Sequence, residues 1–296
     1  MTDVIWTEGL TKRFGDLVAV DNLNLSVKEG ECYAYIGRNG SGKSTTARVL
    51  LGFLRPTKGK TRVLGGVGSN PNIRARIGYL PGELNLPKVM TGADAFAYYG
   101  SLFVGVKRSE LIKLVKRFEL DPSRRVHEMS TGNQRKVGIV LAFMHCPELL
   151  ILDEPTSGLD PIFQAEFRDL LAERKEEGTS IFLTSHIMAE VARVADRVGL
   201  LAERGRLVKE LTMEQLRNQA TDAIRFTFTQ APNLEAFEGV PGVTNIVARD
   251  LDVSVSIDGP VGPLLTRAGE LGAVDVYTMG KDLDTVFTEI YAEENN

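Results

Sequence analysis

Nine residues near the start of the chain, Gly37–Thr45 (GRNGSGKST), constrain its fold more than any other segment. They match G-x-x-x-x-G-K-[ST], in which glycines let backbone N–H groups converge on a phosphate and the next helix adds its positive dipole end. The apolar run before this loop, 31–36, predicts a buried strand, and 45–53 predicts an amphipathic helix. Lys43 would reach the outer phosphates, and Ser44 would bind a magnesium ion. The phosphate-binding candidates are Gly37, Arg38, Asn39, Gly40, Ser41, Gly42, Lys43, Ser44 and Thr45.

Composition narrows the class of protein. The chain has 296 residues, 43% of them hydrophobic, with a net charge of −4 and a pI near 5.6, which argues against a basic surface for nucleic acid. Its longest apolar stretch, Val137–Cys146, is about half of the roughly twenty residues that a membrane-spanning helix needs. No apolar segment of a secretory signal is evident at the N-terminus. The two cysteines, Cys32 and Cys146, are expected as small core residues in a reducing cytosol.

The order of predicted elements divides the chain in two. We expect a first domain over 1–210, with a helical segment over about 83–130, and a second domain over 211–296. Thr91 and Ser109 are the expected N-caps of two helices in the helical segment. Strands are predicted over 4–7, 17–27, 31–36, 61–64, 76–80, 149–152 and 180–183, and further helices over 129–146 and from Asp160-Pro161 to Gly178.

The second domain has an element order of its own. We predict strands over 223–229, 243–250, 253–258 and 274–279, helices over 233–238 and 260–271, and a last helix from Asp282. That order suits a ferredoxin-like βαββαβ unit. Two interpretations of this domain stay open: a ligand-binding regulatory domain, and an appendage for dimerisation or stability.

A second motif, Leu149–Pro155 (LLILDEP), places two acids directly after a buried strand. Such a strand delivers both carboxylates to the carboxyl edge of the sheet, where α/β proteins bind ligands. Asp153 is predicted to hold magnesium, and Glu154 to orient or deprotonate an attacking water. An Asp-Glu pair alone is more often the solvated end of a strand. Because this chain also has a phosphate loop, a nucleotide site becomes the favoured interpretation of the pair.

Four shorter features complete an ordered set of motifs: Met129–Asn133 (MSTGN), Ser157–Asp160 (SGLD), His186 after Thr184-Ser185, and Phe14. With the phosphate loop and LLILDEP, this set resembles the ATP-binding cassette (ABC) family over residues 4–210. MSTGN is similar to the family's LSGGQ signature, and SGLD to its D-loop. The order and spacing of the motifs are more specific than any one of them.

The resemblance implies an α/β fold: an ABC-type P-loop ATPase domain with a RecA-like core, an antiparallel β subdomain and a helical subdomain, followed by a small C-terminal α+β domain. It implies ATP and Mg²⁺ as cofactors. It also implies that the catalytic residues are Lys43, Glu154 and His186. Phe14 would stack on adenine. The resemblance further implies that Ser130 and Gly132 bind the ATP held by the phosphate loop of a second nucleotide-binding subunit, most simply a second copy. Asp160, in the D-loop, is also an expected nucleotide-binding residue.

This sequence departs from the family pattern at two places. Gly82 stands where the family usually has a Gln that touches the metal region and relays nucleotide state to the membrane partner. Glu83 is the candidate substitute at the metal. In the signature, Thr131 replaces a Gly and Asn133 replaces a Gln, while the serine hydroxyl and the second glycine remain. We therefore expect the signature to function as an anion-binding site.

The resemblance implies a transporter ATPase with separately encoded transmembrane permease subunits, placed in the cytoplasm on the inner face of the cell membrane. The departures and the final segment, Asp282–Tyr291, resemble ATPase subunits of drug and antibiotic exporters, so export is the expected activity. The alternative is a non-transport ABC ATPase acting on DNA or ribosomes. DNA-repair relatives have a long coiled coil between phosphate loop and signature, and ribosome-acting relatives usually have two cassettes. The roughly ninety residues here and the single cassette argue against both.

Overall fold

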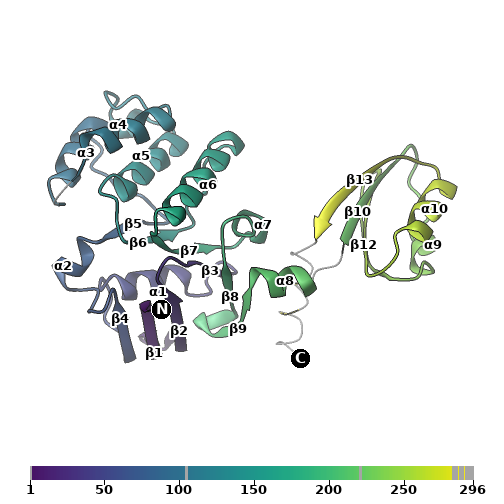
Figure 1. The fold of residues 1–296 in the computed structure, drawn as a ribbon, viewed down its shortest axis with the longest axis horizontal. Helices are drawn as coiled ribbons and strands as arrows, with labels where there is room; N and C mark the ends of the chain where they lie inside the picture. The colour runs from purple at the N-terminus through teal and green to yellow at the C-terminus, as the bar shows by residue number, and fades with distance from the viewer. Residues whose placement is uncertain (1, 104–105, 220–221, 282–285, 287–289, 291–296) are drawn as a thin grey trace. The chain divides into compact units, whose positions relative to one another are not determined.

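A computed structural model describes residues 2–103, 106–219, 222–281, 286 and 290 (Figure 1). The chain forms two compact units, residues 1–212 and 213–296. Within the described ranges, the helices are too short or too polar to cross a bilayer.

A six-stranded sheet organises the first unit. In spatial order its strands are β5 (Ile77–Leu80), β6 (Leu149–Asp153), β7 (Ser180–Ser185), β3 (Cys32–Gly37), β8 (Arg197–Leu201) and β9 (Leu207–Thr212). Only β9 runs antiparallel to its neighbour. Strands β3, β6 and β7 are buried along their whole length, as continuous apolar sequences predict for strands covered on both faces. Because the parallel strands end at one edge, the loops after β3, β6 and β7 meet there.

A second, antiparallel sheet of the first unit has the order β2 (Leu17–Lys28), β1 (Asp3–Phe14) and β4 (Lys58–Val63). The strand predicted over 4–7 is too short, because β1 continues to Phe14 in a hairpin with β2. Register shifts interrupt the pairing on both sides of Gly9, whose φ is +57°. Because of these irregularities and the charged residues at the end of β1, the full length of the strand does not show alternating hydrophobicity in the sequence.

Helices α3, α4 and α5 gather on one side of β5 and β6 (Figure 1). The helices of this unit are α1 (Lys43–Leu50), α2 (Pro71–Arg74), α3 (Gly92–Gly100), α4 (Arg108–Arg117), α5 (Thr131–Phe143), α6 (Pro161–Glu176) and α7 (Met188–Val191), with 3-10 turns η1 (Val126–Glu128) and η2 (Glu203–Gly205). Thr91 caps α3 in a capping box with Asp94, which confirms that prediction. The predicted Ser109 cap is wrong, because α4 begins at Arg108 with Lys107 at the N-cap position, two residues earlier, and has no side-chain cap.

The two cysteines differ. Cys32 lies buried in β3, where burial raises the pKa of its thiol to about 12, and the prediction of a core thiol is confirmed. Cys146 is exposed, so the same prediction is wrong there. Helix α5 ends at Phe143, three residues before Cys146, which has φ +51° in the turn toward β6.

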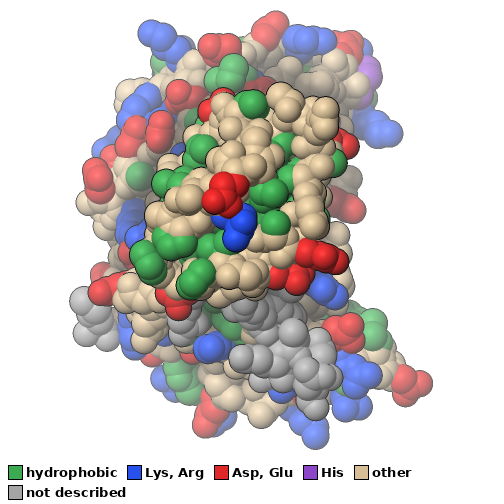
Figure 2. Space-filling model, turned by 90° about the vertical axis from the view of Figure 1, so that its right-hand side faces the viewer, with side chains coloured by type: hydrophobic (Ala, Val, Ile, Leu, Met, Phe, Trp, Pro, Cys, Tyr) green, Lys and Arg blue, Asp and Glu red, His purple; other side chains and the backbone are tan. Residues whose placement is uncertain are grey.

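The second unit begins with α8 (Met213–Gln219) and contains a four-stranded antiparallel sheet. Its strands, in spatial order, are β11 (Val243–Arg249), β12 (Asp252–Ile257), β10 (Asp222–Phe228) and β13 (Ala273–Lys281), crossed by α9 (Glu235–Glu238) and α10 (Gly262–Glu270). This is the strand arrangement of a ferredoxin-like unit, as the element order predicted. Phe226, Phe228 and Phe237 pack in its core. Figure 2 shows hydrophobic side chains among few charged ones on the front of this unit. The last predicted helix, from Asp282, falls outside the described residues apart from Val286 and Ile290.

Candidate active site

The phosphate loop lies between the end of β3 and the start of α1, as predicted. Gly42 is the N-cap of α1 with φ +92°, so Lys43, Ser44 and Thr45 form the first turn of the helix. A Cβ on Gly42 would lie 2.1 Å from the Ala19 carbonyl oxygen, so only glycine fits. Of the remaining loop candidates, Gly37 is the last residue of β3, and Arg38, Asn39, Gly40 and Ser41 lie in the connection itself.

Lys43 is buried and folds back onto its own loop. Its Nζ donates hydrogen bonds to the carbonyl oxygens of Gly37, at 2.6 Å, and Arg38, at 3.1 Å. The same Nζ lies 3.2 Å from Glu154 Oε1, an ion pair without hydrogen-bond geometry. The lysine therefore joins the loop after β3 to the loop after β6.

Asp153 is the last residue of β6 and Glu154 follows it, and both contact Thr184 of the neighbouring β7. Thr184 Oγ1 donates to Asp153 Oδ1 at 2.6 Å, and this carboxylate is only 1% exposed. The Glu154 N–H donates to Thr184 Oγ1 at 3.1 Å and to its carbonyl oxygen at 3.2 Å. Glu154 has φ +47°, a left-handed conformation that turns its side chain out of the strand direction. Thr184 had no predicted role, because its only sequence signal is a threonine at the end of an apolar strand.

His186 completes a chain of three side chains. Its Nδ1 lies 2.7 Å from Glu154 Oε2, so Glu154 stands between the histidine and Lys43. The structure thus brings together all three residues that were predicted as catalytic. A carboxylate held by a histidine at an edge lined with backbone N–H groups can accept a proton from water beside a bound phosphate.

Arg135, in the first turns of α5, is a second residue that the sequence analysis missed. It is 5% exposed, and its guanidinium donates to backbone carbonyl oxygens after β5 and after β6. Burial lowers the pKa of Arg135 to about 10, opposed by the carboxylates of Asp153 and Glu154, so the group is charged at neutral pH. Sequence pattern gave no signal, because an Arg at the start of a helix is ordinarily a solvated residue.

The signature, Met129–Asn133, lies close in space to the D-loop, Ser157–Asp160. Both follow the phosphate loop by more than eighty residues along the chain. Ser130 caps α5, its Oγ accepting the Asn133 N–H at 3.3 Å. Asp160 caps α6, its Oδ1 accepting the N–H groups of Ile162 and Phe163 at 3.1 Å. A Cβ on Gly132 would approach the Gly158 carbonyl oxygen to 2.9 Å, so the two caps are packed closely.

Phe14, Glu83 and Gly82 are the remaining residues with a predicted place near the nucleotide or the metal. Phe14 ends β1 at the hairpin, is 46% exposed, and carries Lys12 Nζ 4.9 Å from its ring centroid. Glu83 is exposed on the loop after β5. A Cβ on Gly82 would lie 3.1 Å from Asp153 Oδ2, so the residue that replaces the family's Gln lies directly against the Asp153 carboxylate.

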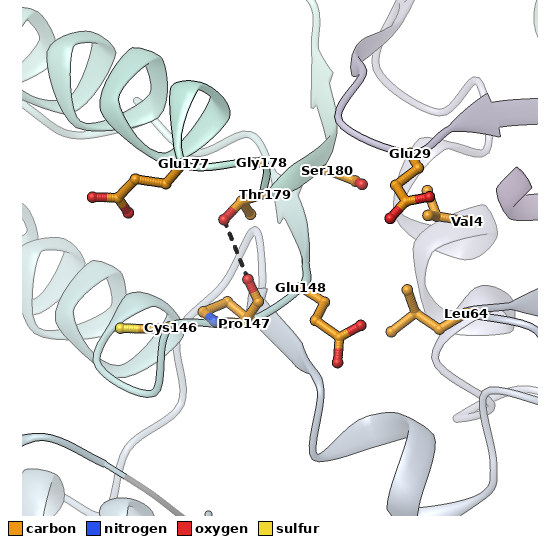
Figure 3. A pocket seen from close by; sticks show the side chains of 10 residues that line it. All are labelled: Val4, Glu29, Leu64, Cys146, Pro147, Glu148, Glu177, Gly178, Thr179 and Ser180. Atoms are coloured by element: carbon orange, nitrogen blue, oxygen red, sulfur yellow. Dashed lines mark hydrogen bonds between the residues drawn. The ribbon is translucent and has the colours of Figure 1, made fainter. Parts of the chain in front are cut away.

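A hollow of about 270 Å³ lies at the opposite edge of the sheet (Figure 3). It is lined near the starts of β6 and β7 by Glu148 and Ser180, and by Cys146 and Glu177. Asp153 and Glu154 lie at the other end of β6, so this hollow is no part of the site above.

The comparisons with known proteins agree with this geometry. The family model described as "ABC transporter" matches residues 20–157. The chain is 35% identical over 232 residues to the bacitracin transport ATP-binding protein BcrA of Bacillus licheniformis, covering 76% of this chain and 75% of that protein. The chain belongs to the ABC transporter family. As a member it is an ATPase, and the non-transport alternative is not favoured.

Two solved structures match most of this ABC ATPase. One, an ATP-binding subunit of an ABC transporter, has a TM-score of 0.67 and 28% identity, covering 73% of this chain and 92% of its own. The other, a dimeric ATP-binding cassette bound to ADP and Pi, has a TM-score of 0.64 and 23% identity, covering 71% and 98%. These matches confirm the fold class.

Proposed function

We propose that this ABC ATPase pairs head-to-tail with a second nucleotide-binding subunit, most simply a second copy, and powers separately encoded permease subunits that export antibiotics or other hydrophobic compounds. The observation that carries the proposal is the chain Lys43–Glu154–His186 at the phosphate loop, together with Ser130 exposed at the N-terminus of α5. The name of the bacitracin relative supports the class of substrate.

In this proposal, the loop 37–45 binds the phosphates of ATP through its N–H groups and the N-terminus of α1. Lys43 leaves the carbonyl oxygens that it now contacts and reaches the outer phosphates. That movement separates Lys43 from Glu154. Glu154 then accepts a proton from the attacking water, while His186 orients the Glu154 carboxylate. Phe14, half exposed at its hairpin, offers a ring on which adenine stacks.

The residues also fit a magnesium ion. Among the described residues, no three His, Cys, Asp or Glu side chains gather in one place. A magnesium ion bound with substrate phosphates needs only one or two protein carboxylates, so Asp153 and Ser44 are sufficient, with Glu83 as a further candidate contact. The ion supplies charge stabilisation for the phosphates when bound.

Ser130, Gly132 and Asp160 would serve the ATP held by the other subunit. Among the described residues, Ser130 Oγ contacts only the Asn133 N–H of its own helix, so its hydroxyl proton can be donated to a phosphate oxygen. The N-terminus of the thirteen-residue α5 adds a favourable dipole. The dimeric cassette with ADP and Pi supports the pairing.

The helical segment 83–130 is the proposed contact with the permease, which would hold the ATPase at the inner face of the cell membrane. Several large apolar side chains are exposed in this segment: Val89, Tyr98, Leu102 and Ile112. Exposed apolar groups of this size favour a protein partner. The C-terminal unit is proposed as a dimerisation or stabilising appendage.

The proposal predicts that Glu154→Gln binds ATP and forms a stable dimer but hydrolyses ATP about 10²- to 10⁴-fold more slowly, the usual contribution of a general base. Steady-state phosphate release and size-exclusion chromatography with ATP measure both effects. Glu148→Gln is the matched control, because Glu148 precedes the other end of β6 and pairs with Arg76. Near-normal turnover in Glu154→Gln would remove Glu154 from the role of base.

A further inference from the structure

Arg135 makes an unusual set of contacts for an arginine. Its guanidinium donates to the carbonyl oxygens of Asp153 at 2.8 Å, Glu154 at 2.5 Å and Pro155 at 3.0 Å. The same group donates to Gly82 at 3.2 Å and to Pro81. A guanidinium has five N–H donors in a rigid fork, and here they all serve five backbone acceptors.

Those acceptors belong to the two loops that surround the Asp153 carboxylate. Glu154 leaves the strand direction with φ +47°, so the carbonyl groups around it turn away from the sheet's hydrogen-bonding pattern. A buried carbonyl without a donor is costly, and Arg135 supplies the donors. The arginine thereby favours the strained backbone that directs the Glu154 side chain to Lys43 and His186.

The other end of this connection is the helix of the signature. Arg135 lies five residues after Ser130, the N-cap of α5, so one rigid helical segment carries both. Gly82 has no side chain to link its loop to the metal region, and its carbonyl oxygen instead contacts Arg135. The signature, the loop after β5 and the loop after β6 thus meet at one cation.

We infer that Arg135 is a positioning residue for ATP hydrolysis, which ties the signature helix to the backbone of Glu154 and the Gly82 loop. The inference rests on the proposed function, in which Glu154 is the base and Ser130 meets the ATP of the second subunit. When that ATP binds at the N-terminus of α5, the effect on the position of α5 is transmitted to the backbone of Glu154 through Arg135. No side chain of the Gly82 loop is needed for this coupling.

Arg135→Lys tests this inference, because it keeps the charge but has three donors on one nitrogen, which cannot serve five carbonyl groups. We expect kcat to fall at least tenfold while KM for ATP stays within about twofold, because the phosphate loop is untouched. Rates are expressed per bound nucleotide, so unfolded chains do not count. Arg174→Lys is the matched control: Arg174 is equally buried but pairs with Glu110 and Glu177, and its kcat should stay within about twofold.

A double-mutant cycle with Glu154→Gln separates positioning from a merely structural role. If Arg135 acts through Glu154, adding Arg135→Lys to Glu154→Gln changes the residual rate by less than about twofold. A parental kcat in Arg135→Lys, an equal fall in both backgrounds, or loss of nucleotide binding would each overturn the inference. Failure of the proposed base is a different result, because Glu154→Gln by itself would then hydrolyse ATP at the parental rate.

Discussion

Lowering the pH should destabilise the first unit through His145. This side chain stacks on Phe103 at 3.9 Å between ring centroids and donates from Nε2 to the Ile77 carbonyl oxygen at 3.3 Å. Its Nδ1 is buried without a hydrogen-bond partner among the described residues. A proton added there has no acceptor, and burial lowers the pKa of His145 from 6.5 to about 4.

The sign and size of the effect follow from linkage. Between pH 6.5 and about 4 the unfolded chain binds a proton at His145 that the folded chain does not, so stability is lost as the pH falls. One pKa unit corresponds to about 1.4 kcal/mol, so the full loss is about 3 kcal/mol. At pH 5 about 2 kcal/mol of it has already occurred.

The perturbation is His145→Gln, which keeps a donor near Ile77 but does not titrate. Urea unfolding at pH 7.5 and pH 5, followed by the fluorescence of Trp6, the only tryptophan, reports on the first unit. The stability difference between parent and variant should shift by about 2 kcal/mol in favour of the variant at pH 5. His127→Gln, at an exposed histidine, is the control substitution and is measured at the same two pH values. An equal difference between parent and His145→Gln at both pH values would refute the reasoning.

Two further substitutions test the phosphate loop and the attachment of α4. Gly42→Ala should weaken binding of a fluorescent ATP analogue more than tenfold, because the added Cβ would meet the Ala19 carbonyl oxygen. Gly178→Ala is the control, because Gly178 has nearly the same φ of +93° but open space around it, and it should lose only about 1 kcal/mol of stability. Equal losses of affinity in the two variants would contradict the steric argument. Arg174→Met leaves the largely buried Glu110 unpaired and should lower the free energy of unfolding in urea by about 3 kcal/mol. Arg76→Met, whose partner Glu148 is exposed, should cost less than about 1 kcal/mol, and similar losses in both would show that burial does not matter here.

Local sequence was enough to predict the parts of the site that one segment builds. The phosphate loop, the acids after β6 and the caps Thr91 and Asp160 each depend on residues within a few positions of one another. The βαββαβ order of the second unit was also readable, because each element has its own hydrophobic period. Local pattern failed where contacts overrode it, as with the long β1 and the exposed Cys146.

By itself, the sequence determined which chemical groups are present and in which order, and it predicted Gly37–Thr45 as a phosphate loop between a strand and a helix. Tertiary structure alone decided that Thr184 holds Asp153, that Gly82 lies against the same carboxylate, and that Arg135 serves the carbonyl groups of two loops. The physical reason is distance along the chain. Thr184 and Asp153 are 31 positions apart, and Arg135 and Gly82 are 53 apart. Only the pairing of β7 with β6 and the packing of α5 bring these donors and acceptors together.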